Sequence, residues 1–390
     1  MIAFRSARAA TMVAEAVTTR TEAVALMARD LPGLRLVPCL EEGEEVRVGT
    51  PLLADRDRPA IRVVSPAPGR VARIDKGYGR RIERIVIRTR PDADWTAPVS
   101  LAGDLRETLL AHGLWPEFRT RPFGRVPEPE AQPDAILVDA LGGAQAAGVR
   151  AARKQPEALS RGLSALRELT RGEVVLCQEG GAALAASLDR LQVKVGLVGR
   201  GGMGAQLRRW HSVARGGEVW TVDCQAVIAI GRLLEAQVLD LSRLIEIASE
   251  EGAGRLRRSV TGADLDEILG GRDDGARAHA LAGDSSYESR RWLGRFETRV
   301  AWPAPDAALT EASGPGPIVP TPALCATLPA GIRAIPLLRA LSIGDAGAAR
   351  RLGCLDLIEE DMRAATMICA SGSDYGALLR RVLDELETER

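Results

Sequence analysis

One stretch decides the fold, Val37 to Asp75, with the sequence VPCLEEGEEVRVGTPLLADRDRPAIRVVSPAPGRVARID. It contains two similar short units, 43–53 and 66–74, and each has a glycine or Pro-Gly turn followed by alternating apolar residues. This alternation is typical of half-buried strands, and the turns mark where the chain reverses. A polar turn, 54–59, separates the two units. The stretch therefore predicts a small module of short strands.

The order of these residues resembles the biotinyl/lipoyl-type barrel-sandwich hybrid. It reads E-G-x-x-V-x-x-G-x-x-L, then a hairpin tip, then P-x-x-G-x-V. The resemblance implies a lysine at the tip, where carrier domains attach a swinging prosthetic group, but this tip reads Asp55, Arg56, Asp57 and Arg58. Because a guanidinium stays protonated near neutral pH, arginine offers no amine nucleophile for acylation. We predict a barrel-sandwich module without its prosthetic group.

Length and composition limit the functional classes. A chain of 390 residues predicts about two to four domains. The 52 basic and 52 acidic side chains balance, so no overall field favours nucleic acid as a partner. No run of about 18 apolar residues occurs, so no transmembrane segment is expected. The six cysteines and three histidines are scattered, which predicts neither an iron–sulfur cluster nor a metal site.

The remaining chain divides by pattern into four further segments. Residues 99–240 alternate helical patterns with four strand patterns, which predicts a parallel, Rossmann-like α/β domain: Ala135–Asp139, Val174–Cys177, Leu191–Val198 and Val219–Asp223. Residues 241–303 begin with a helix-like segment, turn at 252–254 and continue as short strands, which predicts a small α+β domain. Proline-rich residues 304–330 are expected to be a linker, and 331–390 a C-terminal helical domain, after the barrel-sandwich module at 1–98.

The most specific ligand motif is a G-x-G-x-x-G pattern formed by Gly199, Gly201 and Gly204. It follows an apolar strand pattern and precedes a helical one, and a later strand ends in Asp223. In dinucleotide-binding folds such glycines let a pyrophosphate approach a helix N-terminus while the acid binds ribose. However, the chain has 40 glycines, so chance matches are common. An ordinary glycine-rich loop is the favoured alternative.

A second candidate site is the segment with Arg119, Arg121 and Phe123, which offers cations and a ring to an anionic or quinoid ligand. The alternative is a surface loop held by salt bridges. The acidic residues 359–361 are expected to form a solvated first helical turn that complements the helix dipole. No group of residues forms a self-contained active site, and no catalytic residue is predicted.

Several motifs together resemble one family, the A (alpha) subunit of the sodium-translocating NADH:quinone oxidoreductase. More distantly the chain resembles the C subunit of the Rnf-type complex and the flavin-carrying subunit of respiratory complex I. The likeness rests on segments in family order: Gly43–Val46, Ser65–Val71, Gly113–Trp115, Arg119–Phe123, Trp220, Gln225–Gly231, Leu293–Phe296, Gly353–Asp356, Glu359–Asp361 and Tyr375–Gly376. The absence of cysteine clusters argues against the Rnf relative.

The resemblance implies a barrel-sandwich hybrid, a Rossmann-like domain, a β-grasp domain of the SLBB type and a helical C-terminus. It implies a peripheral subunit without its own cofactor, on the cytoplasmic face of the inner membrane. The partners would be integral membrane redox subunits, and ubiquinone would be reduced nearby. Arg119, Arg121 and Phe123 would then face quinone or a partner.

Two departures from the family leave alternatives open. Where the family has a His-Pro-Ala-Gly-x-x-Gly-Thr-His segment, residues 195–201 contain no histidine, and the family's Cys-Pro is Cys369-Ala370. One alternative is a soluble flavin- or dinucleotide-binding oxidoreductase that uses Gly199–Gly204. The other is a divergent paralogue that serves another membrane redox complex, either as one of its subunits or as an assembly factor.

Overall fold

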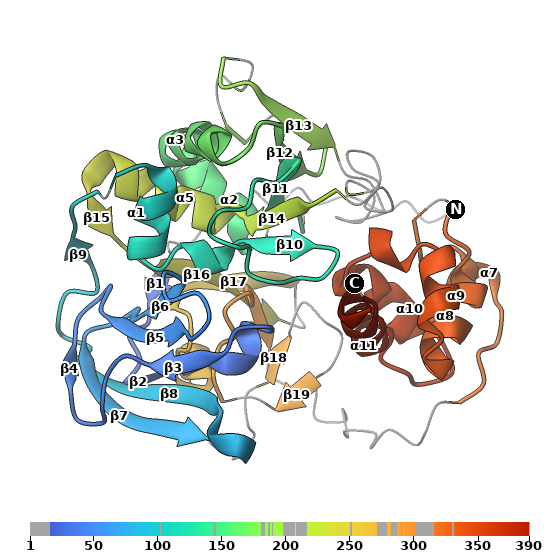
Figure 1. The fold of residues 1–390 in the computed structure, drawn as a ribbon, viewed down its shortest axis with the longest axis horizontal. Coiled ribbons are helices and arrows are strands. Elements are labelled where there is room, and N and C mark those ends of the chain that lie inside the picture. The colour runs from blue at the N-terminus through green and yellow to red at the C-terminus, as the bar shows by residue number, and fades with distance from the viewer. Residues whose placement is uncertain are drawn as a thin grey trace, which may run out of the picture.

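The chain forms a large body of sheets and helices and a smaller helical body made by its C-terminal end (Figure 1). The structure is a computed structural model, and the residues it describes are 16–101, 103–142, 146–180, 184–185, 188, 190–197, 207, 217–249, 252–270, 279–281, 287–289, 291–301, 316–329 and 331–389.

The first part of the chain forms two small antiparallel sheets. Their strand orders are β2-β8-β7-β4 and β3-β5-β6. Buried and exposed residues alternate in β8, where Ile85 and Ile87 are buried and Arg88 is exposed. The strands are β2 (Ala23–Met27), β3 (Leu36–Pro38), β4 (Glu45–Val46), β5 (Pro51–Asp55), β6 (Arg62–Val64), β7 (Gly69–Lys76) and β8 (Ile82–Thr89).

A five-stranded sheet forms the centre of the large body, in the order β10-β14-β11-β12-β13. The four predicted strands are confirmed and run parallel, and β10 joins them antiparallel. The chain proceeds outward from β11 to β13 and then returns to place β14 on the other side of β11. The direction of winding therefore switches between β11 and β14. The strands are β10 (Arg119–Arg121), β11 (Ala135–Ala140), β12 (Glu173–Gln178), β13 (Val193–Leu197) and β14 (Val219–Asp223).

Helices α2 (Ala147–Lys154), α3 (Pro156–Leu166) and α5 (Cys224–Ala236) pack against one face of this sheet. Helix α1 (Leu105–Ala111) begins after Asp104, whose side chain accepts a hydrogen bond from the Glu107 N–H. On the opposite face of the sheet, apolar residues pack with Leu207 and with Ile358 from the C-terminal part of the chain. The sheet is therefore covered by segments from different parts of the sequence.

A six-stranded sheet, ordered β1-β17-β16-β20-β18-β19, lies beside the small antiparallel sheets and the five-stranded sheet (Figure 1). The predicted helix-like segment after Leu241 is wrong, because these residues form a strand that pairs with β17 on one side and β20 on the other. Two flanking strands outweigh a local helical pattern. The elements are β1 (Val17–Thr18), β16 (Ser242–Ser249), β17 (Gly252–Val260), α6 (Leu265–Leu269), β18 (His279–Leu281), β19 (Tyr287–Ser289) and β20 (Arg299–Ala301), with a separate ribbon of β9 (Ala97–Pro98) and β15 (Val238–Leu239).

Residues 316–389, here called the C-terminal bundle, form helices around their own apolar core. The described part of the predicted linker, 316–329, contains α7, and its Leu324 and Leu328 are buried in this core. The helical region therefore begins before residue 331. Its helices are α7 (Pro322–Cys325), α8 (Ala334–Ile343), α9 (Ala346–Arg351), α10 (Arg363–Ile368) and α11 (Tyr375–Thr388).

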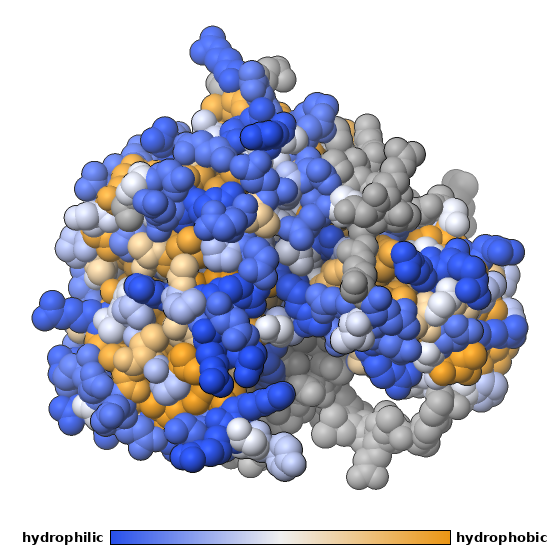
Figure 2. All heavy atoms as spheres, in the orientation of Figure 1, coloured by the Kyte–Doolittle hydropathy of each residue, from blue (hydrophilic) through white to orange (hydrophobic). Residues whose placement is uncertain are grey.

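Short 3₁₀ turns connect several elements: η1 (Ala28–Asp30), η2 (Tyr78–Arg80), η3 (Trp115–Glu117), η4 (Arg167–Leu169), η6 (Cys354–Asp356) and η7 (Glu359–Met362). Hydrophilic residues dominate the surface seen in Figure 2, and hydrophobic ones are spread among them in small groups. Among the described residues, none of the helices has both the length and the apolar character needed to cross a membrane.

Candidate functional site

The segment with Arg119 and Arg121 forms the edge strand β10 and not the surface loop of the alternative interpretation. It pairs with β14, so that Arg119 lies opposite Thr221 and Arg121 opposite Val219. A fully buried aromatic cluster supports both strands, in which the rings of Trp115 and Trp220 meet edge to face at 5.4 Å. The two arginines therefore project from a rigid strand.

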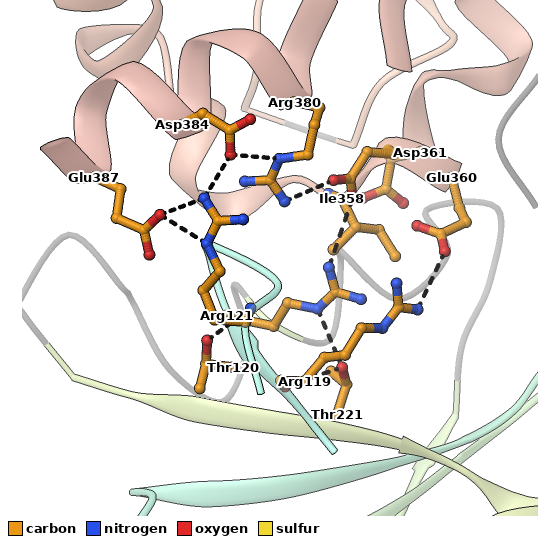
Figure 3. A network of polar contacts seen from close by, with 12 residues as sticks. Arg119, Thr120, Arg121, Thr221, Ile358, Glu360, Asp361, Arg380, Asp384 and Glu387 are labelled. Carbon is orange, nitrogen blue, oxygen red and sulfur yellow. Dashed lines mark hydrogen bonds and ion pairs between the residues drawn. The ribbon is translucent and has the colours of Figure 1, made fainter. Parts of the chain in front are cut away.

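Arg121 is buried and binds both its own sheet and the C-terminal bundle (Figure 3). Its Nε donates to Thr221 Oγ1 at 3.1 Å, and its Nη1 lies 3.6 Å from Glu359 Oε2. Arg380 Nη1 donates to the other Glu359 oxygen at 2.9 Å. Burial alone would raise the pKa of Glu359, but Arg121 and Arg380 outweigh it and lower that pKa. Glu359 is therefore ionised between two guanidinium groups.

This contact corrects the prediction that residues 359–361 form a solvated acidic turn. Glu359 is only 8% exposed, because the sheet lies against the bundle at this point. Sequence patterns report neighbours along the chain, whereas Arg121 lies more than 200 residues away in sequence. In the sequence, the one hint of this ion pair was that an arginine-rich segment and an acidic segment each lack an oppositely charged neighbour.

Two further arginines complete the contact between sheet and bundle. The Arg119 guanidinium lies 4.1 Å from the ring centroid of Phe296 and 3.7 Å from Glu360 Oε1. Arg125 donates from Nε to Glu387 at 2.8 Å and from Nη2 to Asp384 at 2.9 Å. We call this contact the arginine junction: Arg119, Arg121 and Arg125 with Glu359, Glu360, Asp384 and Glu387 (Figure 3).

Phe123, the third residue expected to face quinone or a partner, is buried in the apolar core of the C-terminal bundle. It follows the cis peptide bond between Arg121 and Pro122. The structure therefore brings Arg119, Arg121 and Phe123 together against the chain's own helices. Arg121 is thus ion-paired with the bundle and Phe123 is packed within it, whereas Arg119 keeps 27% of its side chain exposed.

A cavity of about 190 Å³ lies beside the arginine junction, where β11 and β14 end. Its lining includes Arg119, Phe296 and Glu360 as well as Asp139 and Asp223. The two aspartates are direct neighbours in strand register. Because the winding of the sheet switches between these strands, the cavity has the position where open α/β sheets commonly bind ligands.

The pKa values of both aspartates at the cavity are raised, and that of Asp139 reaches the neutral range. Burial, with the Asp223 carboxylate second, raises the pKa of Asp139 to about 7, although Asp139 accepts a hydrogen bond from the Leu141 N–H. Asp223 accepts the Gln225 N–H at 2.7 Å and lies 3.7 Å from Arg243, and burial raises its pKa as well. Adjacent carboxyl groups of this kind titrate as a pair. The cavity can therefore hold a proton near the guanidinium groups of Arg119 and Arg121, which also line it.

Sequence reasoning missed Asp139 as a site residue, although the signal was present. Asp139 and Asp223 each stand at the end of a predicted strand. Since the carboxyl ends of parallel strands meet at one edge of a sheet, that pattern alone places the two acids together.

The barrel hairpin tip is fixed to the rest of the protein. Asp55 is buried, accepts the Arg35 N–H at 2.8 Å and accepts Arg58 Nε at 2.6 Å. Arg58 also forms an ion pair with Glu128, in the loop before β11. A tip held at both sides differs from the mobile tip that a swinging carrier needs.

The predicted dinucleotide motif Gly199, Gly201 and Gly204 lies outside the described residues. Within the described part of the chain, no group of three or more His, Cys, Asp or Glu residues is placed to hold a metal ion. A metal-free and cofactor-free chain stays a prediction.

Comparison with known proteins gives the family. The family model for the NqrA N-terminal barrel-sandwich hybrid domain matches residues 6–90, and that for the NqrA second alpha/beta domain matches 101–238. The A subunit of the Na(+)-translocating NADH-quinone reductase of Pasteurella multocida is 30% identical to this chain over 94% of both chains. The same protein of Neisseria meningitidis serogroup C is 29% identical over 94% of both chains. That of Rhodopirellula baltica is 30% identical over 94% of this chain and 92% of its own.

These matches confirm the predicted barrel-sandwich hybrid and the resemblance stated from the motifs. Two domain models match in the expected order, and the similarity to whole relatives extends into the C-terminal bundle. The chain belongs to the NqrA family, the A subunits of Na(+)-translocating NADH-quinone reductases.

Proposed function

We propose that this chain is the peripheral A subunit of a Na(+)-translocating NADH-quinone reductase complex. The observation that carries the proposal is similarity to such subunits along 94% of both chains. The chain contributes a docking surface and does not catalyse the reaction alone. Its partners are integral membrane redox subunits, and it lies on the cytoplasmic face of the inner membrane.

The proposal is tested by purification from native membranes. A tagged chain extracted in mild detergent at low ionic strength is expected to elute together with integral redox subunits and NADH:quinone reductase activity. Recovery of the chain alone, with the activity left in the membrane fraction, would contradict the proposal. Recovery with a different set of membrane redox subunits would favour the divergent paralogue instead.

We also propose that the chain carries no resident cofactor, and that ubiquinone is bound only at the level of the complex. The competing function, a flavin- or dinucleotide-binding enzyme using Gly199–Gly204, is tested separately. Titration of the purified chain with NADH and with FMN, followed by fluorescence, is expected to show no binding below millimolar concentration. Tighter binding of either compound would overturn the cofactor-free assignment.

Three residues were expected to face quinone. We propose that Arg119 does so, because it alone of the three keeps a partly exposed side chain at the cavity. In the complex, Arg119→Gln is expected to raise the KM for ubiquinone about tenfold while the KM for NADH stays unchanged, since one charge-assisted contact is lost. Arg88→Gln, an exposed arginine on β8, is the matched control. Equal KM values for both variants would exclude Arg119 from the quinone environment.

We assign the finer domain types as follows. The α/β region, 99–240, is Rossmann-like, which is supported by its parallel strands and the switch point between β11 and β14. The region 241–303 is a β-grasp domain of the SLBB type, which is supported by the sheet that contains β16 and β17 and by the short helix α6. Limited proteolysis with mass spectrometry is expected to cut near residues 98, 240 and 303. Fragments that end inside these regions would contradict this division.

A further inference from the structure

The hairpin formed by β7 and β8 extends beyond the strands around it. Strand β2 accompanies β8 only as far as the pair Met27 and Arg84. Residues 76–82 continue past that point and turn through η2, at the lower edge of the molecule in Figure 1. We call residues 76–82 the basic hairpin tip.

The basic hairpin tip holds an aromatic side chain in solvent. Tyr78 is fully exposed, although it is one of only three tyrosines in the chain. The turn is closed by a hydrogen bond from the Gly77 N–H to the Arg81 carbonyl, and both Gly79 and Arg80 have left-handed backbone angles, with φ of 67° and 60°. A residue other than glycine is uncommon in that conformation. The tip therefore keeps an arginine where glycine would be unstrained.

The basic hairpin tip and its base carry a net positive charge. Residues 73–84 contain five basic and two acidic side chains, a net charge of +3. Arg73 and Arg84 both pair with Asp75 at the base. Lys76, Arg80 and Arg81 are exposed and form no ion pair with any residue that the structure describes. The tip therefore presents three cations around one exposed ring.

We propose that the basic hairpin tip binds the anionic headgroups of a lipid bilayer. A tyrosine ring has an apolar body and a polar end, and it is favoured at the headgroup level of membranes. Basic side chains beside it are attracted to anionic lipids. A protein interface generally needs a buried apolar centre, whereas this tip offers one ring and three long, mobile cations. Such a group fits a surface of anionic charge without fixed geometry.

This inference extends the proposed function, because a complex anchored in the membrane holds its peripheral chain beside the bilayer. Its test uses vesicles and the purified full chain without partner subunits. Co-sedimentation is expected with phosphatidylcholine vesicles that contain phosphatidylglycerol, to weaken as salt is raised, and to be absent with phosphatidylcholine alone. A failure of co-purification with redox subunits would leave this result unaffected, so the two proposals fail separately.

Variants locate the binding on the tip. The triple change Lys76→Gln, Arg80→Gln and Arg81→Gln is expected to weaken vesicle affinity on the order of 100-fold, about fivefold for each basic group. Tyr78→Ser is expected to weaken vesicle affinity more at high salt than at low salt, because the ring contributes more than charge when salt screens the basic groups. These residues are exposed, so circular dichroism and melting temperature should match the unaltered chain.

The matched control removes the same charge from exposed arginines elsewhere on the barrel: Arg47→Gln, Arg62→Gln and Arg88→Gln. Its affinity is expected to stay within about threefold of the unaltered chain, since screening limits distant charges. Equal losses in both triple variants, or equal binding to neutral and anionic vesicles, would overturn the proposal. So would a chain that ignores the vesicles yet needs the tip to join the redox subunits, which would identify a protein partner.

Discussion

At the scale of single residues, the buried pair of Arg121 and Glu359 determines how the C-terminal bundle meets the sheet. We expect Arg121→Ala to destabilise the protein by about 3 kcal/mol, because it removes one of the guanidinium groups that balance the buried Glu359 carboxylate. Chemical denaturation followed by circular dichroism measures the effect. Arg121→Met combined with Glu359→Leu should recover most of the loss, since both charges are then removed together. Additive losses in the double variant would show that the two side chains do not interact.

A second residue-scale prediction concerns Asp139. Its pKa of about 7 lies above the value near 4 of an unfolded aspartate, so the folded chain binds more protons between these values. Stability should therefore fall as the pH rises through this range, and stay low above it. Asp139→Asn should stabilise the protein by about 2 kcal/mol at pH 8, allowing for screening of the partly exposed carboxylate, and have almost no effect near pH 4.

Thermal unfolding across that pH range measures the difference. Asp92→Asn, at an exposed position before β9, is the control and should leave the pH profile unchanged. A pH-independent effect of Asp139→Asn would mean that the carboxyl group titrates as it does in the unfolded chain.

At the scale of elements, α3 and α5 cross where each carries a glycine. A Cβ atom at Gly231 would lie 1.9 Å from the Ala158 carbonyl oxygen, and one at Gly162 would lie 2.1 Å from that of Val227. Alanine favours helices, yet Gly231→Ala should destabilise the protein by about 3 kcal/mol, because it forces two backbones apart. Thermal unfolding and amide exchange in α5 measure the change.

The control for that crossing is Gly347→Ala in α9. That glycine is exposed, and its nearest neighbours would be 3.5 Å from a new Cβ. It should be neutral or stabilise by about 0.5 kcal/mol through helix propensity. A similar effect of both substitutions would show that the close approach of α3 and α5 does not contribute to the stability of the fold.

At the scale of the whole molecule, the C-terminal bundle and the large body have separate apolar cores. Within the described chain, Phe123 packs in the core of the bundle, Ile358 of the bundle packs against the five-stranded sheet, and the arginine junction adds charged contacts. Phe123→Ala with Arg125→Ala should weaken this contact by about 4 kcal/mol, from a lost buried ring and partly exposed ion pairs. Small-angle scattering should then show a larger radius of gyration.

Arg333→Ala, an exposed position on the bundle, should leave the scattering curve unchanged. Raising the salt alone should loosen the bundle less than the double variant, because Arg121 and Glu359 are buried from counterions. An unchanged radius for the double variant would mean that contacts other than the junction and Phe123 hold the bundle.

The sequence by itself determined the elements whose cause is local. Alternating apolar residues set β8, short apolar runs set the strands from β11 to β14, Asp104 set the start of α1, and the order of motifs set the family. These succeed because periodicity, capping and turn residues act over a few neighbouring positions.

Only the tertiary structure decided where Arg119 and Arg121 point, that Glu359 is buried, that residues after Leu241 form β16, and that Asp139 titrates near neutral pH. Each depends on groups brought together from distant parts of the chain. The free energy of a buried charge or a central strand is fixed by those neighbours and by the exclusion of water, neither of which is written in the local pattern.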